Sequence, residues 1–115
     1  MFLSCSGDAP VLTTMPVTEI TATSAVSGGL ITDEGSSAID ERGVCWNTES
    51  APTLSSDRTV NGSGPGQFSS NLTGLIPSTK YYLRAYASNK YGTSFGDEIT
   101  FNTSNSETNP GTRII

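Results

Sequence analysis

Residues 75–92 have the sequence LIPSTKYYLRAYASNKYG, and they carry the clearest structural signal in the chain. From Thr79 to Asn89 the side chains alternate between two sets, as they do when a β-strand turns one face to a core. The set that we expect to point inward is Tyr81, Leu83, Ala85 and Ala87. The opposite set is Tyr82, Arg84, Tyr86 and Ser88. The segment Asn89-Lys90-Tyr91-Gly92 is typical of a turn, so we expect the chain to reverse there.

Other segments on both sides of this strand alternate in the same way, with turn residues between them. We expect strands over Val11–Ile20, Ala22–Thr32, Ala38–Asn47, Arg58–Val60, Gln67–Thr73 and Thr93–Thr103. Pro16 weakens the first of these, because proline cannot donate a ladder hydrogen bond. In the third, Val44 and Trp46 share the inward side, which sends Cys45 to the other side. About seven strands in about 95 residues predict an all-β, immunoglobulin-like sandwich of two antiparallel sheets.

The large apolar side chains on the inward sides are sufficient to fill the space between two sheets. The core residues that we expect are Trp46, Leu75, Tyr81, Leu83, Ile99 and Phe101. Each contributes about 1.5–3 kcal/mol when it is fully buried. Gly28-Gly29 in the second strand predicts a bulge or a close approach of another backbone.

Residues 75–81 resemble the L-x-P-x-T-x-Y signature of fibronectin type III domains, and the resemblance extends over most of the chain. It implies that Leu75 packs in the core and that Tyr81 forms a tyrosine corner, with its hydroxyl bonded to an upstream backbone group. The family usually has a core tryptophan on its second strand, where this chain has Val26, and Trp46 on the third strand supplies the bulk instead. This variant is similar to modules of Bacteroidetes-type surface lipoproteins. The resemblance therefore implies a bacterial cell-envelope protein, either anchored to the outer membrane or extracellular.

The composition limits the chemistry that the chain can perform. Its 115 residues include 6 Lys and Arg, 11 Asp and Glu, and no histidine. The lack of histidine excludes Ser-His and Cys-His nucleophiles and most zinc sites. A net charge of −5 does not suit the neutralisation of nucleic-acid phosphates. Adjacent acidic pairs such as Asp97-Glu98 point to opposite faces of a strand, so they do not supply the facing carboxylates of a glycosidase. We therefore expect no enzyme, no cofactor, no metal site and no nucleic-acid partner.

The first residues resemble the end of a bacterial lipoprotein signal peptide, in which small residues precede a cysteine that becomes lipidated. Leu3-Ser4-Cys5 fits this pattern, so we expect residues 1–9 to be a leader with Cys5 as the lipidation site and the only link to a membrane. The alternatives are an incidental cysteine or a disulfide with Cys45, because sequence does not fix connectivity. We assign residues 10–103 to the sandwich and residues 104–115 to a polar linker that leads to a further domain.

Two surface features are candidate interaction sites. Tyr82, Arg84 and Tyr86 form an outward stripe that would stack on sugars or anchor a protein, or would simply stabilise the sheet by cross-strand packing. Lys90 and Tyr91 lie at the tip of the last predicted hairpin, where binding residues often occur. The sequence favours a non-catalytic spacer or protein-interaction module whose partners are neighbouring domains or surface proteins. The alternative is a glycan-binding module that uses the stripe, and an enzyme is the weakest hypothesis.

Overall fold

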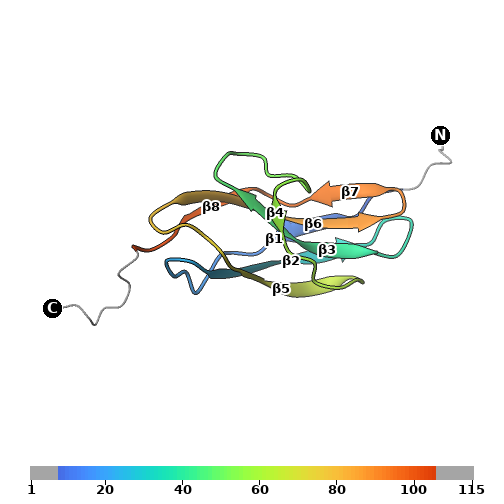
Figure 1. Ribbon diagram of the computed structural model, residues 1–115. Coiled ribbons are helices and arrows are strands. Elements are labelled where there is room, and N and C mark those ends of the chain that lie inside the picture. The colour runs from blue at the N-terminus through green and yellow to red at the C-terminus, as the bar shows by residue number, and fades with distance from the viewer. Residues whose placement is uncertain (1–7, 106–115) are drawn as a thin grey trace.

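The computed structural model describes residues 8–105, and every regular element in that range is a β-strand (Figure 1). The strands are β1 (Val11–Thr14), β2 (Ala25–Asp33), β3 (Glu41–Asn47), β4 (Asp57–Arg58), β5 (Gly66–Leu72), β6 (Lys80–Asn89), β7 (Gly92–Phe95) and β8 (Ile99–Asn102). One antiparallel sheet has the order β1-β2-β5, and the other has the order β4-β3-β6-β7 with β8 also paired to β6. The predicted all-β, two-sheet sandwich is confirmed. Residues 8–105 contain no helix that is long and apolar enough to cross a membrane.

The last predicted strand, residues 93–103, is divided into β7 and β8, which gives eight strands instead of about seven. Both halves pair with β6. Between the pair Tyr86–Phe95 and the pair Leu83–Ile99, residues 84–85 of β6 lie opposite the three residues 96–98. This count defines a β-bulge. The bulge lies against β1, because a Cβ added at Gly96 would be only 2.6 Å from Thr14 Oγ1.

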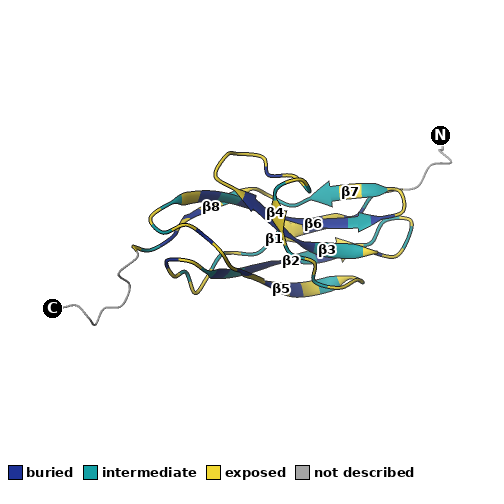
Figure 2. Cartoon of the chain, in the orientation of Figure 1, coloured by how far each residue is buried: buried dark blue, intermediate teal, exposed yellow. Residues whose placement is uncertain are grey.

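The core lies between the two sheets, and Figure 2 shows buried residues along the strands and exposed residues mainly in the loops. The buried core side chains are Leu12, Ala25, Ile31, Ile39, Val44, Trp46, Phe68, Leu72, Leu75, Tyr81, Leu83, Ala85, Ala87 and Phe101. Ile99 is only partly buried and packs at the margin of this core. The sheets approach closely at Gly29, where a Cβ would lie 2.8 Å from both the Ala85 Cβ and the Phe68 ring. A larger residue at position 29 would therefore push the sheets apart.

The corner before β6 is built on Tyr81. Its hydroxyl oxygen accepts a hydrogen bond from the Ile76 N–H at 2.9 Å, and its ring stacks on Phe101 with 5.6 Å between the ring centres. The Thr103 hydroxyl donates to the Ile76 carbonyl at 2.6 Å, so both backbone polar groups of Ile76 are satisfied. The tyrosine corner implied by the sequence resemblance is present.

The described chain begins and finishes at opposite ends of the sandwich (Figure 1). At one end the Asp8 carbonyl accepts hydrogen bonds from the Ser36 N–H at 3.1 Å and from Asn89 Nδ2 at 2.9 Å. At the other end the Ser104 N–H donates to the Thr21 carbonyl at 3.1 Å. Cys5 and residues 106–115 of the predicted linker lie outside the described residues.

Candidate interaction surfaces

The predicted stripe on β6 points away from the core, but one of its three members is not exposed. Tyr86 has no solvent-accessible surface, so the expectation that it belongs to an exposed stripe is wrong. Its hydroxyl proton is shared between the Thr59 carbonyl at 2.5 Å and Glu41 Oε2 at 2.8 Å. Glu41 also forms a salt bridge of 3.3 Å with Arg58. Burial, reinforced by the Glu41 carboxylate, raises the pKa of the Tyr86 hydroxyl.

Arg84, the middle member of the stripe, is held by internal contacts. Its guanidinium carbon lies 3.9 Å from the centre of the Phe95 ring, and its Nε donates to the Pro52 carbonyl at 2.7 Å. The loop that carries Pro52 is also fixed by the Ala51 N–H, which donates to Glu98 Oε1 at 2.5 Å. Arg84 and Glu98 thus fasten residues 48–56 over the outer face of the second sheet, and Arg84 acts as a structural clamp.

Cys45 lies opposite Arg84 on the same sheet and is completely buried. Its thiol donates a weak hydrogen bond to the Arg84 carbonyl at 3.6 Å and has no disulfide partner within residues 8–105. Burial raises the pKa of the Cys45 thiol to about 11. The thiol is therefore protonated at neutral pH and behaves as a small packing group.

Tyr82 is the member of the stripe that remains accessible, at its half-buried position on β6. It faces Asn47 of β3 and Thr100 of β8 in the sheet register, and the Lys80 Nζ lies 5.2 Å from the centre of its ring. Asn102 lies opposite Lys80, and all four neighbours are exposed. We name these five residues the Tyr82 patch. It combines one aromatic face with amide, hydroxyl and ammonium groups on a flat part of the sheet.

The tip of the β6–β7 hairpin holds Lys90 and Tyr91 in the open, and Tyr91 is 45% exposed. The Lys90 Nζ lies 5.3 Å from the centre of the Tyr91 ring. The buried Asn89 side chain fixes the turn, because its Oδ1 accepts the N–H groups of Tyr91 at 2.8 Å and Gly92 at 3.1 Å. Its Nδ2 donates to the carbonyls of Asp8 and Glu34, both at 2.9 Å, so one amide ties three segments together.

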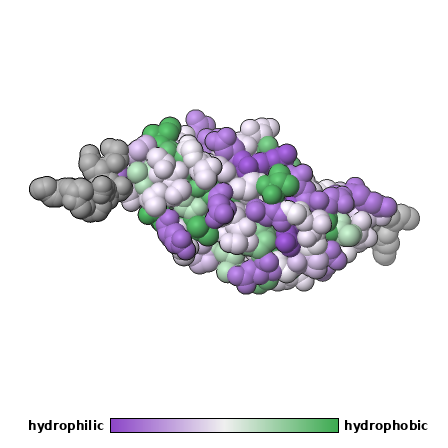
Figure 3. Space-filling view, turned by 60° about the horizontal axis from the view of Figure 1, so that its bottom comes forward, coloured by the Kyte–Doolittle hydropathy of each residue, from purple (hydrophilic) through white to green (hydrophobic). Residues whose placement is uncertain are grey.

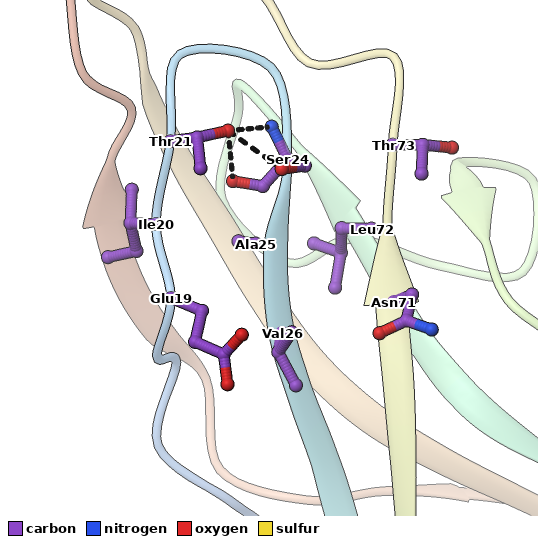
Figure 4. Close-up of a pocket in the computed structure, with 9 residues that line it drawn as sticks. All are labelled: Glu19, Ile20, Thr21, Ser24, Ala25, Val26, Asn71, Leu72 and Thr73. Atoms are coloured by element: carbon purple, nitrogen blue, oxygen red, sulfur yellow. Dashed lines mark hydrogen bonds between the residues drawn. The ribbon is translucent and has the colours of Figure 1, made fainter. Parts of the chain in front are cut away.

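Two open hollows lie along β2, and they share Val26 in their linings. The larger has a volume of about 500 Å³, and Figure 4 shows the Glu19 carboxylate and the Asn71 amide on opposite sides of Val26. Glu19 is the single ionisable residue in this lining, and the smaller hollow of about 220 Å³ has none. Neither hollow therefore has the two facing carboxylates of a glycosidase. Across residues 8–105, no group of three or more Cys, Asp or Glu side chains is arranged to hold a metal ion.

The sandwich is similar to several solved structures. No protein-family model and no curated protein sequence matches the chain. The FN1–FN3 domains of chicken CNTN1 superpose with a TM-score of 0.66 and 16% identity, over 85% of this chain and 33% of that chain. The fibronectin type-III domain of human fibronectin type III domain containing protein 3 gives 0.56 and 16% over 97% and 98% of the two chains. The chain has the fibronectin type III fold.

A bacterial structure is similar to the same extent. The sensor domain of the anti-sigma factor RsgI4 from Pseudobacteroides cellulosolvens gives a TM-score of 0.61 and 24% identity, over 85% of this chain and 97% of that chain. In the fibronectin type III fold of the present chain, the tyrosine corner is kept at Tyr81 while the core tryptophan, Trp46, lies on β3. The fold leaves the Tyr82 patch and the hairpin tip as the accessible parts of the predicted site.

Proposed function

We propose that this fibronectin type III module is a non-catalytic spacer or protein-interaction module of a bacterial cell-envelope protein. The observation that carries the proposal is the placement of the two chain ends. The chain is fastened at Asp8 beside the β6–β7 tip and leaves at Ser104 beside residues 19–24, at the opposite end. Because the two chain ends lie at opposite ends of a folded sandwich, the domains attached to them are held apart by the length of the sandwich.

The interaction role is supported by the hairpin tip, where Lys90 and Tyr91 are exposed on a turn that Asn89 holds rigid. A preorganised aromatic side chain loses little conformational freedom when it binds a partner. The envelope location, outer-membrane anchored or extracellular, is supported by the lipoprotein-like pattern around Cys5. The similarity to a bacterial sensor domain agrees with a module that serves a larger protein.

The test is a domain replacement in the full-length protein, expressed in its native host. In one variant residues 8–105 are exchanged for an unrelated fibronectin type III domain, and in another Lys90 and Tyr91 are both changed to alanine. A pure spacer retains surface display and partner capture in both variants, whereas an interaction module loses capture in both. If deletion of residues 8–105 changes neither display nor capture, the proposal is wrong. The intact mass of the same protein tests lipidation, since an unmodified Cys5 contradicts the anchor.

The second candidate function, glycan binding, is favoured by the Tyr82 patch alone. Sugars stack on an aromatic ring and use surrounding amide and hydroxyl groups as hydrogen-bond partners, and the patch supplies both. Tyr86 does not contribute because it is buried, and Arg84 is held inside the domain by the Pro52 carbonyl and the Phe95 ring.

Titration against a polysaccharide panel separates the two functions. Glycan binding predicts retardation in affinity electrophoresis that Tyr82→Ala abolishes and Tyr91→Ala leaves unchanged. These two variants remove the same side chain from different surfaces, so they form a matched pair. The absence of retardation by every polysaccharide in the panel contradicts the glycan function and leaves the spacer proposal in place.

A further inference from the structure

Three of the four sheet edges are protected against pairing with another strand. β1 has four residues, and Pro16 follows two residues after its end. β4 has two residues, both charged, and the β7–β8 edge is broken by the bulge that carries Asp97 and Glu98. Short strands, proline, charge and bulges are the features by which natural sheets prevent edge-to-edge association.

The fourth edge, β5, is long and has neither a charged residue nor a bulge, and Pro65 lies just outside the strand, before Gly66. It runs for seven residues in unbroken register with β2, from Gly66 opposite Ile31 to Leu72 opposite Ala25. It contains no proline and no charged residue. In an antiparallel strand every second residue points its N–H and C=O away from the paired neighbour. Within residues 8–105 no backbone group of β5 bonds to any segment other than β2, and no strand lies beyond β5 at the lower margin of Figure 1.

The sequence around β5 is uncharged, although the protein has a net charge of −5, and the Arg42 guanidinium lies 5.2 Å from the ring of Phe68 on the inner side of β5. All 21 residues from Thr59 to Thr79 are uncharged, which covers β5 and the loops on both sides of it. Figure 3 shows the lower side of the molecule turned forward, with small hydrophobic areas dispersed among hydrophilic ones. Two equally charged copies repel each other over most of their surfaces, so they meet most easily along this neutral edge.

We propose that two copies of this chain associate through β5, with the two strands antiparallel about a twofold axis at Ser69. The seven residues of β5 are centred on Ser69, so Gln67 of one copy faces Asn71 of the other, twice. These side chains are exposed and neutral, and their amides both donate and accept hydrogen bonds. Phe68 and Leu72 point inward and stay in the core of their own copy. The product is a continuous six-stranded sheet with the order β1-β2-β5-β5-β2-β1.

A second copy fits this edge better than an unrelated strand does. In this pairing the exposed residues Gln67, Ser69 and Asn71 of one copy lie opposite neutral polar residues of the other. Because β5 contains no charged residue, it offers no ion pair to a charged strand of another protein. A twofold interface is also self-complementary, because both copies present the same surface and every contact occurs twice.

The first test measures the mass of the full 115-residue chain by sedimentation from about 10 μM to about 1 mM, the range of a weak dimer. We expect reversible dimers. Ser69→Lys puts two like charges face to face on the axis and should weaken the dimer about fivefold or more. Thr93→Lys, at an exposed site on the β7 edge, adds the same charge and should leave the dimer unchanged. A monomer at every concentration, or equal dimerisation of both variants, overturns the proposal.

The second test fixes the register. Residues that face each other across an antiparallel pair have Cα atoms about 4.5–5.5 Å apart, within the span of a disulfide. In a Cys5→Ser background, Ser69→Cys should form a covalent dimer under mild oxidation, while Thr93→Cys should not. Cys45 does not interfere, because it is buried. Equal cross-linking of both variants, or no cross-linking of Ser69→Cys, shows that the two β5 edges do not meet at Ser69.

Discussion

Replacing Tyr86 by phenylalanine removes one hydroxyl group from a closed part of the fold and keeps the ring. In the wild-type protein that hydroxyl is the hydrogen-bond donor to the Thr59 carbonyl and to Glu41 Oε2. Segment 57–61 covers the ring, and Thr59 reaches back to β3 through its N–H and its hydroxyl. The variant therefore leaves a covered carbonyl without a donor while the packing of the ring stays the same.

The cost follows from those two acceptors. A hydrogen bond to a charged group contributes about 1.5–3 kcal/mol, and an unsatisfied buried carbonyl costs about 1–3 kcal/mol. The two terms describe the same missing proton, so they are not added. Glu41 keeps its salt bridge with Arg58 in the variant, so the loss of its hydrogen bond with Tyr86 contributes only part of the destabilisation. We expect Tyr86→Phe to lower the free energy of unfolding by about 2 kcal/mol, out of about 5–15 kcal/mol for a typical domain.

The assay is urea unfolding at neutral pH, followed by the fluorescence of Trp46, the single tryptophan. Tyr82→Phe is the matched control, because the Tyr82 hydroxyl makes no hydrogen bond within residues 8–105, and we expect a change within about 0.5 kcal/mol. If Tyr86→Phe were as mild as Tyr82→Phe, the covered environment of Tyr86 and its two acceptors would be refuted. An equal loss in both variants would refute the distinction between the two positions.

Three further predictions concern separate parts of the fold. The pKa of the Cys45 thiol rises from 9.0 to about 11 on folding. The protonated thiol therefore makes its full contribution to the free energy of unfolding below about pH 9, and this contribution is lost as the pH rises through about 11. Urea midpoints should therefore fall over that range, and Cys45→Ala should make the fall smaller; an unchanged slope contradicts the burial of the thiol. Ala51 has a φ of +58°, so Ala51→Gly should raise the free energy of unfolding by about 0.5–1 kcal/mol, measured in urea; a decrease contradicts this account. Arg42 donates to the carbonyls of Asn61, Gly64 and Pro65, and Arg42→Lys should cost about 1–2 kcal/mol and speed amide exchange in that loop; unchanged exchange rates would refute the clamp.

The fold could be predicted from the sequence because side-chain alternation reports which face of a strand is buried. Alternation places Val44 and Trp46 inside and Cys45 outside, and the structure agrees. The LIPSTKY motif also locates the corner at Tyr81, since the Ile76 N–H that the hydroxyl accepts lies only five residues away. Both features can be predicted because they depend only on residues that are close together in the sequence.

The candidate site was harder to predict because alternation says nothing about what covers an outer face. Tyr86 and Tyr82 are equivalent in the pattern, but segment 57–61 covers only the first. That cover depends on a contact 27 residues away along the chain, which no local signal marks. The sequence marks Asn89 only as a turn residue, whereas in the structure its buried amide binds the carbonyl of Asp8, 81 residues away.

Several charged and amide side chains in this domain bind backbone groups. Arg42, Arg84 and Glu98 each hold a loop by its carbonyl or N–H groups, whereas residues 8–105 contain one ion pair, Glu41–Arg58. A chain so rich in Ser, Thr and Gly has long loops with many backbone groups to satisfy, and this use of charge satisfies them. The middle of the outer face of the second sheet, at Cys45 and Tyr86, is covered by residues 48–61. The contacts with other molecules that we propose use the Tyr82 patch, the hairpin tip and the β5 edge, and these three surfaces lie on different parts of the sandwich.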